Sequence, residues 1–258
     1  MSLLAGWLQA LPWMLATALV AWAICTVRRN AGLVDIFWPL FLLVAALCFL
    51  REVDVPTGRA LLAFWLVGIW ALRLAAHLAL RNWNAPEDHR YQAIRSRNQP
   101  GFEWKSLYLV FGLQAVLAFI VSLPLHAAIS SPAGFNPLDA AGAALVVAGV
   151  LVETIADTQL AAFRDDPASR GQVLDRGLWR YSRHPNYFGE FCVWWGFFLL
   201  ALATGAWWAI LSPLLMSVLL MRVSGVTLLE KDIGQRRPGY AGYVARTNAF
   251  FPGPRRSA

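Results

Sequence analysis

Charged residues are scarce in this sequence. Asp, Glu, Lys and Arg together make up 14% of the 258 residues, whereas a soluble domain contains about 25%. Apolar residues make up 58% and include 13 tryptophans, whereas a soluble domain is about 45–50% apolar. High apolar content with few charges excludes a disordered chain and a water-soluble globule. The composition therefore predicts an integral membrane protein.

Cysteines are few, and short repeats and common cofactor motifs are absent. The three cysteines lie in apolar runs, which excludes a disulfide scaffold and favours packing roles. Without a short repeat, collagen and coiled coil are excluded. No Cys/His cluster has metal-ligand spacing, and the G-x-G-x-x-G fingerprint of soluble dinucleotide-binding domains is missing. We therefore expect no metal site, and any dinucleotide cofactor would be held by membrane helices and basic loops.

Seven apolar stretches approach the length of about 20 residues that a helix needs to cross a bilayer. They predict an all-α polytopic integral membrane protein, a single membrane domain with about seven transmembrane helices. The last two stretches are short and nearly continuous, which favours a tight helical hairpin. The stretches are Leu3–Cys25, Ala31–Leu50, Ala60–Ala79, Ser106–Leu125, Leu138–Leu160, Phe191–Gly205 and Trp207–Met221.

Lysine and arginine fall on alternate loops and give a net charge of +7. They follow the first, third, fifth and seventh stretches, so the positive-inside rule places these segments and the carboxy terminus in the cytoplasm and the amino terminus outside. The opposite loops hold only Arg51 and Arg59, balanced by Glu52 and Asp54. Because the basic residues set membrane orientation, we expect no nucleic-acid partner, and no protein partner is evident.

Six ionisable side chains lie within the predicted spans, where charge is costly and indicates function. Under the predicted orientation all six fall in the cytoplasmic half of the membrane. Independent structural ion pairs, the alternative explanation, have no reason to share one depth. We therefore predict one polar cavity open to the cytoplasm, lined by Asp35, Arg73, His77, Glu153, Asp157 and Glu190.

Helical spacing groups several of these residues. Glu153, Asp157 and Arg164 are separated by four and seven residues, which places them on one helical face. Arg73 and His77 also share a face, four residues apart. For this second pair a snorkelling arginine beside a core histidine is an equally good explanation.

The segment GLWRYSRHPNYFGE, residues 177–190, is unusually polar for a membrane protein and directly precedes an apolar run. Pro185 disfavours helix at His184 and predicts a turn, and Glu190 lies near the positive end of the following helix. The alternative is an interfacial belt, but a belt requires no His-Pro-Asn-Tyr turn. Arginine suits phosphate, asparagine an amide or ribose edge, and tyrosine stacking, and the turn contains Arg180, Tyr181, Arg183, Asn186 and Tyr187.

The sequence RYSRHPNYFGE followed by WWG, together with the tail LLEKDIGQRRPGYAGYVARTNAFFPG, resembles the carboxy-terminal domain of the steroid 5-alpha-reductase family over Leu151–Pro252. VDIFW at Val34–Trp38 and EDHRY at Glu87–Tyr91 resemble the bacterial branch of this family, made of multi-pass proteins. The resemblance implies a reductase of the bacterial inner membrane that uses NADPH. It implies reduction of an activated carbon–carbon double bond in an apolar small molecule that enters from the bilayer.

The resemblance also implies cofactor contacts. Glu153 and Asp157 match the family's Asn-x-x-x-Asp pair, with Glu153 departing from the asparagine, and Arg164 matches the arginine that follows. Arg90 and Tyr91 resemble loop contacts to the phosphate end of the cofactor. The predicted contacts in the turn and the tail are Arg180, Arg183, His184, Asn186, Tyr187, Glu190, Glu230 and Tyr243.

The catalytic end departs further from the family. Steroid reductases use a Gln-Glu pair on the second span and a tyrosine on the third, and neither is clear here, so steroid is a doubtful substrate. Asp35, Arg73 and His77 are the catalytic candidates. Asp35 is our first choice as proton donor, because a carboxyl group in an apolar pocket can stay protonated. A neighbouring Arg73 would make Asp35 an orienting group instead.

Three other functions compete with the reductase, one of them a quinone- or lipid-binding structural protein. The Arg-His-Pro-x-Tyr turn and the Tyr-x-x-Tyr tail also resemble the isoprenylcysteine carboxyl methyltransferases, which use S-adenosylmethionine. Glu190 after Gly189 and the number of arginines favour the reductase, since cationic adenosylmethionine needs no arginine cluster. A transporter is disfavoured because few polar residues continue into the outer half of the membrane.

Overall fold

The computed structural model describes residues 3–223 and 239–256, and every regular element in these ranges is a helix. This agrees with the predicted all-α class. The chain groups into two compact units. The first unit comprises Met1–Asp139 with Leu200–Ser212, and the second comprises Ala140–Leu199 with Pro213–Ala258.

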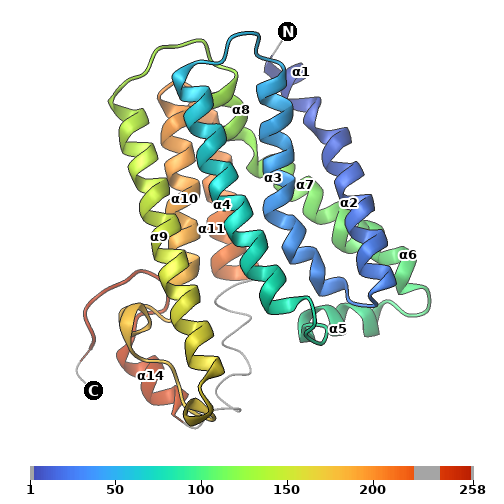
Figure 1. The fold of residues 1–258 in the computed structure, drawn as a ribbon, viewed down its shortest axis with the longest axis vertical. Helices are drawn as coiled ribbons and strands as arrows, with labels where there is room; N and C mark the ends of the chain where they lie inside the picture. The colour runs from blue at the N-terminus through green and yellow to red at the C-terminus, as the bar shows by residue number, and fades with distance from the viewer. Residues whose placement is uncertain (1–2, 224–238, 257–258) are drawn as a thin grey trace. The chain divides into compact units, whose positions relative to one another are not determined.

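The first unit is built around helix α3. Figure 1 shows α3 between α2 and α4, and it packs against both. Asn30 and Thr57 start elements here, because their side chains accept hydrogen bonds from the backbone N–H groups of Gly32 and Ala60. The elements are α1 (Leu3–Leu8), α2 (Ala10–Val27), the 3-10 helix η1 (Ala31–Leu33), α3 (Val34–Arg51) and α4 (Gly58–Asn82).

The rest of the first unit begins with a short polar helix, α5 (His89–Arg97), and continues with apolar segments. The second of these segments, η2, is a π-helix, a wider turn that is frequent at functional sites. The apolar elements are α6 (Phe102–Ser106), η2 (Leu107–Gly112), α7 (Leu113–Val121), α8 (Leu123–Ile129) and the 3-10 helix η5 (Trp207–Ile210).

In the second unit, α9 (Pro137–Asp165) and α10 (Pro185–Leu202) pack through glycines and run side by side (Figure 1). A Cβ atom added to Gly189 would lie 2.7 Å from the carbonyl oxygen of Gly149, closer than real contacts allow. Small residues let membrane helices approach this closely. The other elements are η3 (Pro167–Ser169), η4 (Gly177–Arg180), α11 (Leu211–Val218), η6 (Leu219–Val223) and α14 (Tyr240–Arg246).

Within residues 3–223 and 239–256, five helical segments are long and apolar enough to cross a membrane, which supports a polytopic membrane protein. The predicted sixth and seventh spans correspond to α10 and to the shorter apolar helix Trp207–Arg222. The count of seven and the orientation of the termini stay predictions. The five segments are Leu4–Val27, Ala31–Arg51, Gly58–Asn82, Phe102–Val121 and Pro137–Asp165.

The sequence analysis interpreted Arg59 as a loop charge balanced by acidic neighbours, but the structure shows a different environment. Its side chain is fully buried and pairs with Asp139, with 2.5 Å between Nε and Oδ1 and 2.8 Å between Nη2 and Oδ2. Nη1 and Nη2 also donate to the carbonyl oxygens of Ala133 and Gly134, at 3.0 and 2.6 Å. This buried pair attaches the start of α4 to the first turn of α9 and to the loop before it.

Candidate functional site

The first polar site joins the two motifs VDIFW and EDHRY in the first unit. Asp35 Oδ1 accepts a hydrogen bond of 2.5 Å from the Tyr91 hydroxyl, and Oδ2 pairs with Arg90 Nη2 at 3.1 Å. Gln114 on α7 donates from Nε2 to the Tyr91 hydroxyl oxygen at 3.1 Å. We name these residues, Asp35, Arg90, Tyr91 and Gln114, the Asp35 cluster. They come from three helices, so the cluster is a tertiary site.

Local structure places the two residues of α5 in this cluster. Asp88 caps the helix, because its Oδ1 accepts from the backbone N–H of Arg90 at 2.9 Å and from Arg90 Nε at 3.0 Å. The guanidinium of Arg90 therefore lies between Asp88 and Asp35. Glu87 connects α5 to the segment before α3. Its carboxylate accepts hydrogen bonds from the backbone N–H of Ala31 at 2.7 Å and from Arg95 at 2.8 and 2.9 Å.

The pKa values reflect burial opposed by charge pairing. Burial alone would lower the pKa of Arg90, but the negative charge of Asp35 and the hydrogen bond and charge of Asp88 together outweigh it, and the pKa is raised. Burial would raise the pKa of Asp88, but hydrogen bonds from Arg90 lower it. Tyr91 is buried and lies beside Asp35, and both effects raise its pKa. Arg90 therefore stays charged, and Tyr91 stays protonated over the physiological range.

The catalytic candidates lie at one end of the first unit. Asp35 is in the first turn of α3, while Arg73 and His77 are half-buried on α4. The two helices are joined by a short loop and pack together, so these positions are at the same end. The Asp35 carboxylate accepts from two donors, a geometry that favours the orienting role over the predicted proton donor. Which group donates the proton stays a prediction.

The second polar site lies in the second unit and joins α9 to the start of α10. Asn186 Nδ2 donates to Asp157 Oδ1 at 3.2 Å. Glu153, one turn earlier on α9, is buried with 2% of its surface exposed. Its Cγ packs against Gly189, where an added Cβ would lie 2.7 Å away. We name Glu153, Asp157 and Asn186 the Asp157 cluster. The structure therefore brings together the predicted acidic face and the predicted turn.

The turn before α10 is held by the carboxy-terminal tail. Arg183 donates from Nη1 to the carbonyl oxygen of Thr247 at 2.7 Å, and its backbone N–H donates to Asn248 at 2.9 Å. Ser182 Oγ donates to the carbonyl oxygen of Phe250 at 2.7 Å. Part of the Arg183 guanidinium therefore fixes the tail, and its predicted phosphate contact stays a prediction.

The other predicted cofactor residues occupy different environments. His184 is buried and its ring stacks on that of Tyr187, with centroids 5.8 Å apart. The Tyr243 hydroxyl donates to the carbonyl oxygen of Trp179 at 2.6 Å. Arg164, Arg180 and Tyr181 are exposed, and Glu190 is half-buried. Glu230 lies outside the described residues.

Sequence reasoning missed Gln114, Glu87 and Asp88 as members of these sites. Glu87 and Asp88 lie inside the EDHRY motif itself, so the motif was the available signal. Gln114 is a lone polar residue in an apolar span, and its isolation could have marked it. Its Oε1 is buried without a hydrogen-bond partner among the described residues.

Comparisons with known proteins place the chain in a family whose function is not described. Residues 21–247 match the family described as "Protein of unknown function (DUF1295)". A relative in Schizosaccharomyces pombe, "Uncharacterized protein C594.04c", is 23% identical over 265 residues, covering 90% of this chain and 76% of that protein. No solved structure matches. Because the match covers most of the sequence, the chain belongs to the DUF1295 family, which is related to the steroid 5-alpha-reductase-like proteins.

Proposed function

We propose that this protein is a membrane-embedded reductase of the bacterial branch resembling steroid reductases. It uses NADPH to reduce an activated carbon–carbon double bond in an apolar substrate taken from the bilayer. The observation that carries the proposal is the hydrogen bond between Asp157 and Asn186, because it joins two segments whose residues resemble the family's cofactor contacts. The relationship of the family to steroid 5-alpha-reductase-like proteins supports the same chemistry.

The donor set of the second unit fits such a cofactor. Asp157 and Asn186 form a polar edge suited to a carboxamide or ribose hydroxyl, and the exposed Arg164 and Arg180 suit phosphate groups. NADPH would supply a hydride to the substrate. Glu153, beside Gly189, stands where the family has asparagine, so its carboxylate changes the charge offered to the ligand.

The Asp35 cluster suits the substrate end of the reaction. Hydride addition to an enone leaves negative charge on the carbonyl oxygen, which a hydrogen-bond donor in a dry site stabilises. The Tyr91 hydroxyl is buried and held by Asp35 and Gln114 at 2.5 and 3.1 Å. Tyr91 joins Asp35, Arg73 and His77 as a donor candidate, although its one hydroxyl hydrogen is donated to Asp35 here and would have to turn from Asp35 to a substrate oxygen.

Identification of bound small molecules tests the proposal. The protein is purified in mild detergent, and co-purifying compounds are identified by mass spectrometry. NADPH or NADP is the expected result. S-adenosylmethionine or its demethylated product would overturn the reductase and support a methyltransferase, because the turn and tail with Tyr243 resemble that family too.

A further inference from the structure

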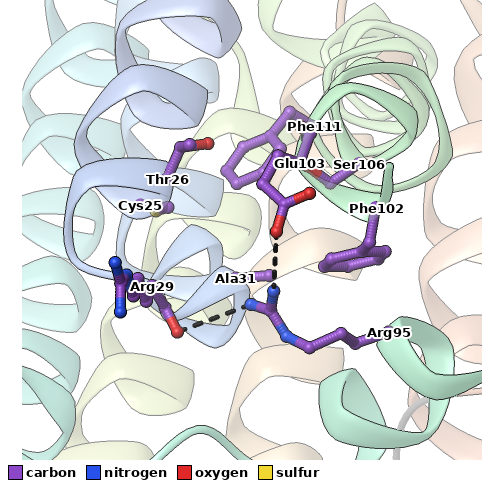
Figure 2. Close-up of a pocket in the computed structure, with 9 residues that line it drawn as sticks. All are labelled: Cys25, Thr26, Arg29, Ala31, Arg95, Phe102, Glu103, Ser106 and Phe111. Carbon is purple, nitrogen blue, oxygen red and sulfur yellow. Dashed lines mark hydrogen bonds and ion pairs between the residues drawn. The ribbon is translucent and has the colours of Figure 1, made fainter. Parts of the chain in front are cut away.

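The small pocket in the first unit, between the end of α2 and the start of α6, has its polar groups matched within the protein. Its volume is about 30 Å³, which is room for about one or two waters. Figure 2 shows Arg95 directed at two acceptors, the carbonyl oxygen of Arg29 at 3.4 Å and the Glu103 carboxylate at 4.0 Å. This pocket therefore fits water rather than a larger ligand.

In the second unit, the side chain of Ser182 connects the turn before α10 to the carboxy-terminal tail. Its Oγ donates to the carbonyl oxygen of Phe250 at 2.7 Å and accepts from the backbone N–H of His184 at 3.1 Å. A hydroxyl group can donate once and accept at the same time, so the two bonds are compatible. Ser182 is fully buried and His184 is 6% exposed. Loss of the hydroxyl would therefore remove this acceptor from a buried N–H group.

Backbone hydrogen bonds hold the tail on both sides of this serine. The backbone N–H of Arg183 donates to the carbonyl oxygen of Asn248 at 2.9 Å, and the N–H of Gly253 donates to the carbonyl oxygen of Tyr181 at 3.2 Å. We name residues 247–253 the tail strap. Three consecutive residues of the turn are therefore bonded to the strap.

The N–H group held by the serine hydroxyl belongs to the residue directly before α10. His184 precedes Pro185, the first residue of the helix, and its carbonyl oxygen accepts from the N–H of Phe188 at 3.0 Å. Proline is favoured at the first helical position because its φ is already helical. Asn186 follows as the second residue, and its Nδ2 donates to Asp157 Oδ1 at 3.2 Å. The placement of His184 therefore sets the direction of Asn186.

The other end of the turn is attached to α9. Trp179 Nε1 donates to the carbonyl oxygen of Ala156 at 3.0 Å, and the backbone N–H of Leu178 donates to Gln159 Oε1 at 2.9 Å. Ala156 and Gln159 flank Asp157 in the sequence. The turn is therefore fixed to α9 at one end and to the strap at the other.

We propose that the tail strap, bound through Ser182, directs Asn186 toward Asp157 and so couples docking of the strap to ligand binding at the Asp157 cluster. Ser182 is a positioning residue, because its hydroxyl contacts the turn and the strap. Coupling between two binding events is reciprocal, so a ligand held by Asn186 also stabilises the docked strap. The choice of NADPH as this ligand rests on the proposed function, whereas the positioning of the turn does not.

Hydrogen–deuterium exchange of the purified full chain in detergent, without cofactor, tests the positioning. The variant is Ser182→Ala. The matched control, Ser169→Ala, removes another buried hydroxyl from the second unit, one that donates to Asp166 Oδ2 at 3.3 Å. We expect the backbone amides of residues 183–188 to exchange roughly tenfold faster in Ser182→Ala, because one hydrogen bond is lost, and at the parent rate in the control. Parent-like exchange of this segment in Ser182→Ala would overturn the proposal.

Equilibrium binding of NADPH to the same proteins tests the coupling. Ser182→Ala should bind NADPH roughly tenfold more weakly than the parent, and Ser169→Ala should bind it equally. Added to Asn186→Ala, the serine substitution should cause no further loss, because it acts through Asn186. A further tenfold loss in the double variant would overturn this role.

A measurement on the parent alone does not depend on how any variant folds. Saturating NADPH should slow exchange of the backbone amides in the strap, including that of Gly253, which bonds to the turn. Unchanged strap exchange in a parent that binds NADPH would refute the coupling. A folded parent that does not bind NADPH would refute the proposed reductase, and the exchange experiment without cofactor would still decide whether Ser182 positions the turn.

Discussion

The Asp35 cluster and the Asp157 cluster are both polar sites in a largely apolar protein, but they are stabilised differently. Asp35 is held by the charge of Arg90 and the hydroxyl of Tyr91, and Asp88 also pairs with Arg90. The Asp157 cluster depends on a close glycine contact between two helices and on a tail bound through backbone carbonyls. Substitutions that change side-chain charge should therefore destabilise the first site, and substitutions that increase side-chain volume should destabilise the second.

The largest expected effect is at the glycine contact. Gly189→Ala places a Cβ atom 2.7 Å from the Gly149 carbonyl oxygen and from Glu153 Cγ, so α9 and α10 must separate. We expect a loss of about 1–3 kcal/mol in the free energy of unfolding, typical of overpacking. Denaturant unfolding in detergent measures it. Gly58→Ala is the control, because nothing lies within 4 Å of an added Cβ there, and an equal loss in both variants would refute close packing as the cause.

The next effect is at Asp35. Asp35→Ala removes the acceptor of the buried Tyr91 hydroxyl and one of the two carboxylates that pair with Arg90, and we expect destabilisation by about 1–3 kcal/mol. Asp35→Asn keeps one acceptor oxygen and should lose less. Once a substrate is found, an orienting role for Asp35 predicts that Tyr91→Phe lowers turnover as much as Asp35→Ala. Full turnover in Tyr91→Phe, with Asp35→Ala inactive, would restore Asp35 as the donor.

A smaller effect is expected where the tail binds the turn. Tyr243→Phe removes the hydroxyl that donates to the Trp179 carbonyl oxygen at 2.6 Å. The cost should be about 0.5–1.5 kcal/mol, the usual contribution of one hydrogen bond. Tyr108→Phe is the control, since Tyr108 is 62% exposed. Thermal unfolding of both variants checks the difference, and no difference would show that the tail adds nothing to this unit.

The smallest effect concerns pH. The pKa of Asp88 is lower in the folded protein than its ordinary value of 3.8, because hydrogen bonds from Arg90 outweigh burial. A lowered pKa stabilises the fold above the ordinary value, and this stability is lost as the pH falls below about 4. Melting temperatures between pH 6 and pH 3 should therefore fall less for Asp88→Asn than for the parent. Parallel curves would show that this carboxylate carries no acid sensitivity.

Much of the fold could be predicted because membrane helices are determined by local composition. Long apolar runs, helical spacing at Glu153 and Asp157, and the His184-Pro185 turn are all local patterns, and the structure has helices and a turn at these places. Asp157 and Asn186 were each singled out because they resemble cofactor contacts of one family, and the hydrogen bond between them comes from the structure.

Tertiary pairings could not be predicted in the same way. Asp35 and Arg90 are 55 positions apart, and nothing in a single sequence selects Arg90 from the many arginines expected on the same side. Arg59 was assigned to a loop for the same reason, although it forms a buried pair with Asp139. The contact of Arg183 with the Thr247 carbonyl oxygen has no side-chain pattern, because every residue carries a carbonyl group.

Equilibrium binding of NADPH to the purified protein tests the central claim most directly. The measurement compares the parent with Asn186→Ala and with Thr158→Ala, a control whose exposed side chain is next to Asp157 on α9. We expect saturable binding to the parent, roughly tenfold to hundredfold weaker binding to Asn186→Ala, and unchanged binding to Thr158→Ala. Equal NADPH affinity in all three proteins, or no binding to a folded parent, would contradict it.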